Sequence, residues 1–381
     1  MSKEFYRAVG RTDVWPELTH QHPSELTYDD VILAPRERTT IESRGEVQMH
    51  RQIGPFLLEI PIISAPMDTV SGEEMLRELH RLGAIGTLPR GDLSTRLNIC
   101  ERLSNEGVRG IYAVRHRRRS EHSGEMSGVE EAQLLAERGA RVILVDVAHG
   151  GMQQVMETAR DIKELRYGLA QITEETLQTA VDIQEKMGLT VIAGNIVTYE
   201  QACAYKEYGI DIARVGVGPG GVCKTRQVAG TGFPQLSAIF ETSESGIMVI
   251  ADGGIRYPGD VAKALAAGAD YVMIGSMFAG TDEAPGEVIE KDGQSYKLLR
   301  GQASRQYMND HGVSLTRHRA EEGVAKYVPY KGAVEHLVLE LSGGLASAMS
   351  YQGARTLDEF YDLSRFQTVS KAALDEGKPH A

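Results

Sequence analysis

Eight short apolar runs recur along the chain, and most of them are continuous rather than alternating. They are IPIISA (60–65), GAIGTL (83–88), GIYAV (110–114), VILVDV (142–147), TVIAG (190–194), IARVGV (212–217), IMVIAD (247–252) and YVMIG (271–275). Continuous apolar runs are typical of strands that are buried on both faces, as in a parallel sheet. Segments with a helical pattern separate them, for example GEEMLRELHRL and YPGDVAKALAAGA. Eight strands alternating with helices predict an α/β fold, the (β/α)8 TIM barrel, with a doubly wound open sheet as the alternative.

The length of the chain, 381 residues, suits one large domain of this kind. We therefore expect a single barrel domain over residues 1–381. Within it we expect an N-terminal extension at 1–25, a mobile flap and active-site insertion after the eighth strand at 277–331, and a polar tail at 368–381.

Charge and cysteine content exclude several classes of function. The formal net charge is -12, which is unfavourable for a general nucleic-acid partner. Three cysteines without a CxxC pair favour neither a disulfide framework nor a cysteine-based zinc site. No apolar run reaches membrane-spanning length, and the first twenty residues lack the apolar core of a secretory signal. We therefore expect a cytoplasmic protein without a membrane partner.

Polar residues follow the predicted strands at the points where these strands end. In TIM barrels the active site lies at the carboxyl ends of the strands. The residues at these ends are Ser64, Asp146, Asn195, the 218–226 loop, Asp252 and Ser276. The sequence therefore predicts an active site formed by these polar groups at the carboxyl ends of the strands.

The last two strands are followed by glycine-rich turns, ADGG and IGS. The loops after strands seven and eight are a frequent phosphate site in this fold. Gly253, Gly254 and Gly275 would let backbone N–H groups approach phosphate oxygens, and Ser276 would add a hydroxyl. Asp252 can accept hydrogen bonds from ribose hydroxyls. The alternative is that these glycines only form tight turns.

Cys223 lies in the segment GPGGVCKTR, between a glycine-rich turn and two basic residues. Nearby positive charge from Lys224 and Arg226 would favour its thiolate form. Cys100 and Cys203 fall on predicted helices and lack such surroundings. Cys223 is therefore the candidate nucleophile, and a small buried hydrophobic residue is the alternative.

Long stretches of the chain resemble the IMP dehydrogenase/GMP reductase family, from about residue 26 to residue 367. The similar segments are LTYDDVILAPRE, SAPMDTVSG, VDVAHGG, VIAGNIVT, VGVGPGGVCKTRQVAGTGFPQLSAI, IADGGIRYPGDVAKALAAGADYVMIGSMFAGTDEAPGE and VPYKGAVEHLVLELSGGLASAMSYQGARTL. The resemblance implies a (β/α)8 barrel, usually a homotetramer, that binds a purine 5'-monophosphate and a nicotinamide cofactor. It also implies that Cys223 attacks C2 of the purine, and that backbone carbonyls of Gly218, Gly220 and Cys223 bind potassium.

The resemblance also implies roles for further residues. Thr225 and Glu322 would form a proton relay, and Asp146 and Asn195 would lie near the nicotinamide and the reacting carbon. The residues implied at the substrate are Ser64, Met67, Asp252, Gly253, Gly254, Gly275, Ser276, Gly301, Gln302 and Ala303. The alternatives are purely structural roles: a turn cap for Thr225, a solvated acid for Glu322 and a buried strand-end cap for Asp146.

Two reaction directions are open within this resemblance. A reductase would convert GMP and NADPH to IMP and ammonia, whereas a dehydrogenase would convert IMP and NAD to XMP. The reductase is favoured because the GTLPRG and GIYAV runs are too close to enclose the regulatory CBS pair, and because RHRAEEG resembles the reductase segment with its catalytic Glu322. No Arg-Tyr pair in 300–330 matches the dehydrogenase flap. SAPMDTV and GTDEAPGE are instead similar to dehydrogenases.

Three departures from the family pattern affect specificity. Gly221 replaces the usual phosphate-contacting serine, and Gln302 replaces a methionine at the base, which leaves a different purine-like nucleotide as a third possibility. After the third predicted strand, Arg115 and Arg117 begin a basic stretch that would bind the 2'-phosphate of NADPH. The alternative for this stretch is a solvated basic loop.

Overall fold

The computed structural model describes residues 26–116, 126–165, 188–312, 318 and 320–377. The expected N-terminal extension at 1–25 therefore lies outside the described residues, as does the basic stretch from 117 to 125.

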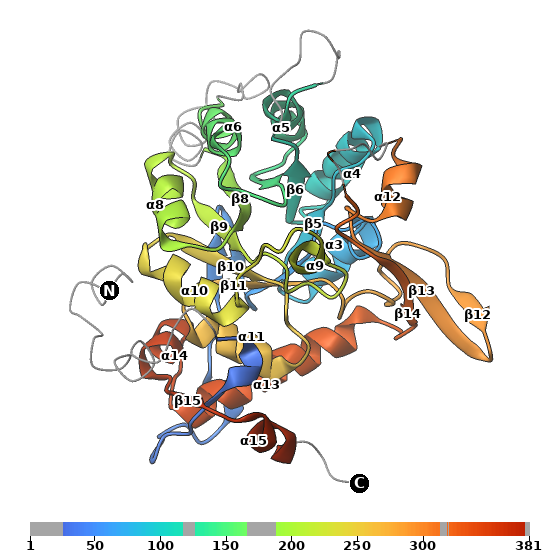
Figure 1. Cartoon of the computed structure of the whole chain (residues 1–381). Coiled ribbons are helices and arrows are strands. Elements are labelled where there is room, and N and C mark those ends of the chain that lie inside the picture. Colours follow the sequence, from blue (N-terminus) through green and yellow to red (C-terminus); the bar gives the residue numbers. More distant parts are fainter. Residues whose placement is uncertain (1–25, 117–125, 166–187, 313–317, 319, 378–381) are drawn as a thin grey trace.

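Eight parallel strands form the central sheet, and they coincide with the eight apolar runs (Figure 1). They are β4 (Ile62–Ser64), β5 (Gly86–Leu88), β6 (Gly110–Val114), β7 (Val142–Asp146), β8 (Thr190–Ile196), β9 (Ile212–Val215), β10 (Met248–Asp252) and β11 (Tyr271–Ile274). The order is β4-β11-β10-β9-β8-β7-β6-β5, and a parallel bridge between Ile63 and Ile85 joins the two ends. The sheet is thus closed, which confirms the (β/α)8 barrel and excludes the open sheet.

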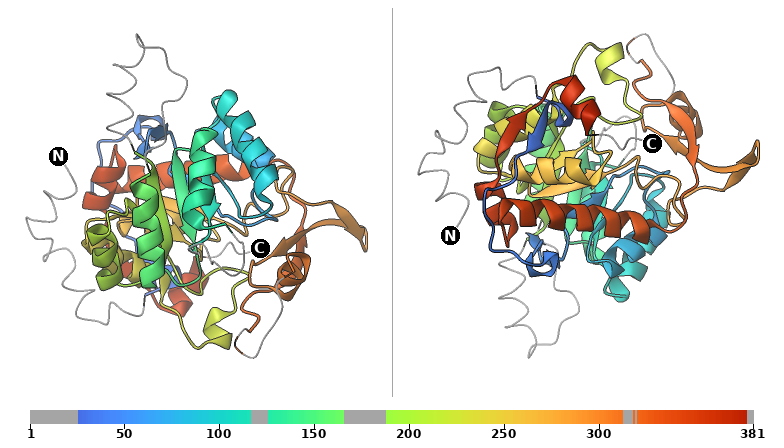
Figure 2. Two further views of the ribbon diagram at one scale, coloured as in Figure 1. Left: turned by 90° about the horizontal axis from the view of Figure 1, so that it is seen from above. Right: turned by 90° about the horizontal axis from the view of Figure 1, so that it is seen from below.

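Helices surround the barrel on its outside (Figure 2). They are α3 (Glu73–Arg81), α4 (Leu93–Asn105), α5 (Gly128–Glu137), α6 (Gln153–Lys163), α8 (Tyr199–Glu207), α10 (Gln235–Glu244), α11 (Pro258–Ala266) and α13 (Val334–Gln352). Side-chain caps define several of their starts, because a capping oxygen satisfies an otherwise unpaired backbone N–H. Asp92 caps α4, Ser127 caps α5 and Thr198 caps α8.

Alternate residues of each strand face two different apolar regions. On β7, Val142 and Leu144 belong to the cluster inside the barrel, whereas Ile143 and Val145 pack against the helices. This alternation explains the continuous apolar runs, because both faces of every strand are buried. A hairpin of β2 (Arg51–Ile53) and β3 (Phe56–Leu58) adds Ile53 and Leu58 to the inner cluster.

The insertion after β11 forms a small antiparallel sheet with one short helix. Its elements are β12 (Ile289–Lys291), β13 (Gln294–Arg300), α12 (Arg305–Asp310) and β14 (Ala325–Pro329). Lys297 of β13 is buried, and its Nζ donates to the carbonyls of Thr281 at 2.8 Å and Ala284 at 2.6 Å. One ammonium group therefore attaches this sheet to the loop that leaves the barrel.

The remaining elements lie near the ends of the chain, except for α9 in the loop after β9. They are the 3-10 turns η2 (Tyr28–Asp30) and η3 (Arg44–Glu46), the strands β1 (Val31–Leu33) and β15 (Phe366–Thr368), and the helices α9 (Thr225–Val228), α14 (Leu357–Leu363) and α15 (Lys371–Glu376). Strands β1 and β15 pair antiparallel, so the two ends of the described chain meet. Among the described helices, none combines the length and the apolar character needed to span a bilayer.

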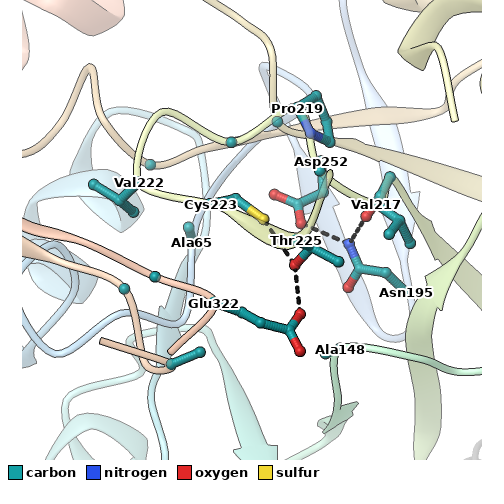
Figure 3. A pocket seen from close by; sticks show the side chains of 18 of the residues that line it. Ala65, Ala148, Asn195, Val217, Pro219, Val222, Cys223, Thr225, Asp252 and Glu322 are labelled. Carbon is teal, nitrogen blue, oxygen red and sulfur yellow. Dashed lines mark hydrogen bonds between the residues drawn. The ribbon is translucent and has the colours of Figure 1, made fainter. Parts of the chain in front are cut away.

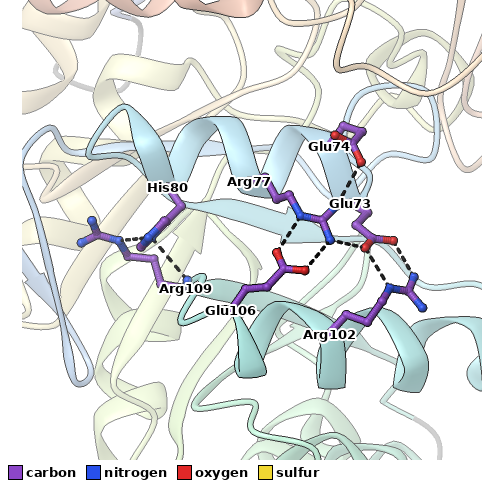
Figure 4. Close-up of polar contacts among 7 residues, drawn as sticks. All are labelled: Glu73, Glu74, Arg77, His80, Arg102, Glu106 and Arg109. Atoms are coloured by element: carbon purple, nitrogen blue, oxygen red, sulfur yellow. Dashed lines mark hydrogen bonds and ion pairs between the residues drawn. The ribbon is translucent and has the colours of Figure 1, made fainter.

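A polar network joins α3 to α4 and to the loop that follows α4 (Figure 4). Nη2 of Arg77 lies 2.6 Å from Glu73, and its Nε donates to Glu106 at 2.8 Å. At the other end of α3, Nδ1 of His80 accepts a hydrogen bond from Nε of Arg109 at 2.9 Å. The ion pairs are partly exposed to solvent, so each contributes only modestly to stability.

Candidate active site

The carboxyl ends of the strands surround a cavity of about 880 Å³. The sequence-predicted residues that line it are Met67, Asp146, Asn195, Gly218, Gly220, Cys223, Thr225, Asp252, Gly253, Gly254, Gly275, Ser276, Gly301, Gln302, Ala303 and Glu322. Ser64 is not among the lining residues: it is fully buried, and its Oγ lies 2.7 Å from Ser71 and accepts the N–H of Thr87. Ala65 and Pro66, which follow it, reach the cavity instead.

Cys223, Thr225 and Glu322 form a continuous chain of hydrogen bonds (Figure 3). Sγ of Cys223 lies 3.2 Å from Oγ1 of Thr225, and this hydroxyl donates to Oε2 of Glu322 at 2.9 Å. The cysteine is exposed, whereas Cys100 is buried in the helical layer. A thiol that faces a cavity and is linked to a carboxylate through a hydroxyl is suited to nucleophilic chemistry with proton transfer.

Backbone pairing brings Glu322 to the loop at residues 218–226, here called the cysteine loop. The N–H of Lys224 donates to the carbonyl of Glu322 at 2.7 Å, and Cys223 forms an antiparallel bridge with Gly323. The N–H of Val324 then donates to the carbonyl of Val222 at 3.0 Å. The insertion after β11 therefore adds a short strand to the cysteine loop, and this strand carries the carboxylate.

The predicted phosphate residues form one side of the cavity. Gly253 and Gly254 have φ angles of +94° and +81°, which a residue with a side chain rarely adopts. A Cβ on Gly221 would lie 2.7 Å from Oγ of Ser276, so the glycine leaves room for this hydroxyl. Nζ of Lys331 donates to the carbonyl of Ser276 at 3.1 Å and adds positive charge nearby.

A second polar group consists of two carboxylates joined by one arginine. Nη1 of Arg214 donates to Asp146 at 2.5 Å, and its Nε donates to Asp252 at 3.0 Å. Asn195 also donates to Asp252, at 2.8 Å. Burial raises the pKa of Asp146, but the positive charges of Arg90 and Arg214 outweigh it and hold that pKa below its usual value. Asp146 is therefore held ionised, and hydrogen bonds orient both carboxylates.

Arg90 extends this group toward the insertion. Its Nε donates to Asp146 at 3.2 Å, and its Nη2 donates to Oε1 of Gln302 at 2.7 Å. Nε2 of Gln302 donates to the carbonyl of Pro66 at 2.6 Å. Arg90 and Arg214 line the cavity together with Asp146.

Sequence reasoning missed both arginines, although each leaves a signal. Arg214 is a charged residue inside an apolar strand run, IARVGV, and it is buried there. A buried charge requires a partner, so a barrel prediction should have paired it with the strand-end acids. Arg90 follows the strand run GAIGTL at its carboxyl end, where functional residues of this fold lie.

The IMP dehydrogenase / GMP reductase domain model matches residues 25–380. The chain belongs to the IMP dehydrogenase/GMP reductase family. Two relatives illustrate the range of this family. GMP reductase from Onchocerca volvulus is 34% identical, over 94% of this chain and 94% of its own length. Inosine-5'-monophosphate dehydrogenase from Borreliella burgdorferi is 31% identical, over 93% of this chain and 96% of its own length.

A solved structure of the family has the same fold. It is a variant of GMP reductase from Trypanosoma brucei in complex with guanosine 5'-monophosphate, with a TM-score of 0.81 and 27% identity. The alignment covers 96% of this chain and 99% of that chain. The fold therefore extends over nearly the whole length of both proteins.

Two groups expected from the family stay predictions. Arg115 is half-buried and is not among the described residues that line the cavity, and Arg117 lies outside the described residues. The carbonyls expected to bind potassium belong to one loop, in which Gly220 accepts the N–H of Cys223 at 3.0 Å. Uncharged carbonyl oxygens suit a monovalent cation. In the described part of the chain, no cluster of histidine, cysteine and acidic residues could hold a metal ion.

Proposed function

We propose that this protein is a GMP reductase that acts through a covalent adduct between Cys223 and C2 of the purine. The thiolate adds to C2, the 2-amino group leaves as ammonia, and a hydride added to C2 then displaces the sulfur to give IMP. A reduced nicotinamide cofactor would supply this hydride. The hydrogen-bonded chain from Cys223 through Thr225 to Glu322 carries the proposal. Splitting one substitution into two steps lowers each barrier.

The relay supplies the proton that the leaving amine requires. An amide anion is a poor leaving group, so the amino nitrogen must be protonated as its bond to C2 breaks. Thr225 lies between the sulfur and the carboxyl group of Glu322, and its hydroxyl can pass a proton in either direction. Glu322 is therefore proposed as the proton store, with Thr225 as the connecting group.

The rest of the cavity is proposed to hold the nucleotide and the cofactor. Gly254, Gly275 and Ser276 would bind the 5'-phosphate, and Asp252 would bind the ribose hydroxyls, because its orientation is fixed by Arg214. Met67, Gly253, Gly301, Gln302 and Ala303 would contact the nucleotide, with Asp146 and Asn195 toward the nicotinamide. Hydrogen bonds that fix an acid before the ligand arrives reduce the cost of binding.

Further features are proposed as well. They are NADPH rather than NADH as the cofactor, held by Arg115 and Arg117, potassium on the carbonyls of Gly218, Gly220 and Cys223, a homotetramer, and a cytoplasmic location. The flap at 277–331 and the tail at 368–381 are proposed as parts of one domain. Neither a nucleic acid nor a membrane is proposed as a partner.

The second candidate is IMP dehydrogenase activity, which forms XMP from IMP and NAD. A relative of that name is 31% identical over nearly the full length, so this candidate has support. Water would then have to be activated next to Thr225 without the Arg-Tyr pair of that enzyme class. A different purine-like nucleotide is the third candidate, because Gly221 and Gln302 replace residues of the family pattern.

One assay separates these candidates. Purified protein is mixed with GMP plus NADPH, GMP plus NADH, or IMP plus NAD, and the absorbance of the reduced cofactor is followed. We expect GMP-dependent oxidation of NADPH, faster than that of NADH, with release of ammonia. Replacing Arg117 by alanine should raise the KM for NADPH and leave that for NADH unchanged, because only NADPH has a 2'-phosphate. Formation of XMP with no reaction of GMP would establish the dehydrogenase instead.

A further inference from the structure

The segment LTYDDV, residues 26–31, reaches the cavity although it precedes the first barrel strand. Its residues Thr27, Tyr28 and Asp29 line the cavity together with the glycine turn that follows β10. Tyr28 is only 3% exposed, so nearly all of its ring is packed against other residues. Interiors are closely packed, so a buried ring beside a binding loop can fix the position of that loop.

The glycine turn after β10 has little stiffness of its own. Gly253 and Gly254 both have positive φ angles, and glycine has the widest conformational freedom of all residues. A Cβ on Gly253 would lie 2.9 Å from Cγ of Pro219. A Cβ on Gly254 would lie 3.2 Å from Cε2 of Tyr28 and 3.5 Å from Cβ of Pro219. The turn is therefore held between the cysteine loop, which contains Pro219, and the ring of Tyr28.

Hydrogen bonds to two helices of the barrel keep Tyr28 in place. The N–H of Leu26 donates to Oγ of Ser237 on α10 at 2.9 Å, and the N–H of Ser237 donates to the carbonyl of Leu26 at 3.1 Å. Nζ of Lys263 on α11 donates to the carbonyl of Tyr28 at 2.8 Å. The backbone that carries the ring is thus attached to the scaffold on both sides of the turn, so the ring forms a fixed wall.

We infer that Tyr28 is a positioning residue for the nucleotide phosphate, because its ring holds Gly253 and Gly254 against the loop that carries Cys223. The inference rests on the proposed function only for the placement of a 5'-phosphate at this turn. Backbone donors that are fixed before the ligand arrives bind it at a lower entropic cost. A nucleoside has no phosphate to place there, so its binding does not depend on the ring.

Titration calorimetry without a cofactor tests this role. The affinities for GMP and guanosine are measured for the wild-type protein and for Tyr28→Leu, Tyr28→Met and Tyr28→Phe. The wild type should bind GMP roughly a hundredfold more tightly than guanosine. We expect Tyr28→Leu and Tyr28→Met to reduce this ratio at least about tenfold, through weaker binding of GMP alone, because the turn loses its wall. Tyr28→Phe should restore most of the ratio, since it keeps the ring and Oη makes no hydrogen bond within the described part of the chain.

A control variant and a stability measurement exclude a general loss of structure. Tyr351→Leu, at an exposed position of α13 outside the cavity, should leave the ratio unchanged. Urea titration shows which variants are folded. Tyr28→Met decides the test if Tyr28→Leu does not fold, because its unbranched side chain fills more of the length of the ring.

The outcomes separate this inference from the reaction itself. An unchanged ratio in the folded leucine and methionine variants overturns the inference, even if GMP is reduced with NADPH. Equal losses of affinity for GMP and guanosine overturn it as well, because a purely structural role would produce them. The same holds if Tyr28→Phe loses as much of the ratio as Tyr28→Leu. A ratio that depends on Tyr28, in a protein that does not oxidise NADPH with GMP, would support the inference and refute the reductase proposal.

Discussion

Oγ1 of Thr225 lies 2.9 Å from Oε2 of Glu322, although 97 residues separate them in the chain. The first residue belongs to the loop after β9, and the second belongs to the insertion after β11. Their contact depends on the antiparallel bridge between Cys223 and Gly323, so the relay exists only when the insertion is docked. The chemistry proposed for Cys223 would therefore depend on the conformation of the insertion.

Loss of the carboxylate should affect chemistry more than binding. In Glu322→Gln the side chain can no longer hold the proton that Thr225 passes to the leaving amine, so ammonia release should slow by about 10²–10⁴-fold. The affinity for GMP should change little, which calorimetry can check beside the steady-state kcat. Glu321→Gln is a neighbouring control, because Glu321 pairs with Arg305 rather than with Thr225. Equal losses in both variants would contradict the relay.

The nucleophile can be tested by a conservative replacement. Cys223→Ser should lower kcat by at least about a thousandfold, because a serine hydroxyl is far less nucleophilic than a thiolate near neutral pH. Binding of GMP should persist. The control is Cys203→Ser on α8, which should retain nearly full activity. Substantial turnover by the Cys223 variant would exclude the covalent adduct.

The phosphate side of the cavity predicts a large difference between nucleotide and nucleoside. Guanosine should bind roughly a hundredfold more weakly than GMP, because the donors around Gly254 and Ser276 would lose their partner. Calorimetry with both ligands measures this ratio. In Gly254→Ala the ratio should shrink, since φ of +81° at this position is strained for alanine and the turn must shift. Similar affinities for guanosine and GMP in the wild type would show that these residues do not bind the phosphate.

Arg214 should be essential for stability as well as for the site. It is buried between Asp146 and Asp252, so Arg214→Met leaves Asp252 without its counter-charge and Asp146 with Arg90 alone. Breaking a buried pair typically costs about 3–5 kcal/mol of the free energy of unfolding. Urea titration should detect this loss. The control is Arg160→Met on the exposed side of α6, whose free energy of unfolding should stay within about 0.5 kcal/mol of the wild type. An equally small loss in Arg214→Met would show that the two acids find other partners.

His80 gives the fold a specific dependence on pH. Burial and then the nearby positive charge of Arg109 lower the pKa of His80, so its neutral form is favoured in the folded state. A lowered folded-state pKa means that the unfolded chain takes up the proton first. The contribution of His80 is therefore complete above the unfolded pKa and is lost as pH falls through the folded pKa.

Urea titrations at pH 8 and below pH 6 measure this loss. Replacement of His80 by glutamine should make the decline toward acid shallower than in the wild type, by a small amount because the ring is partly exposed. His336→Gln, at an exposed position of α13, serves for comparison. An identical decline in the His80 variant and the wild type would assign the acid sensitivity to other groups.

The sequence alone determined the architecture and most of the candidate residues of the site. Apolar runs such as VILVDV are continuous because each strand packs on two apolar layers, and this two-sided burial is what a closed barrel requires. The strand ends then brought Asp252 and the cysteine loop together, since parallel strands in a barrel end on one face. The nucleophile, Thr225 and Glu322 were available as candidates from motifs similar to those of the family.

Only the tertiary structure decided which polar groups touch. Arg214 and Arg90 were missed because pairing across strands depends on barrel register and side-chain reach, neither of which a local pattern contains. Ser64 was misplaced relative to the cavity because alternate residues at a strand end face opposite sides, and its hydroxyl is used by Ser71. The orientation of the Gln302 amide follows from Arg90, which is distant in sequence and adjacent only in the fold.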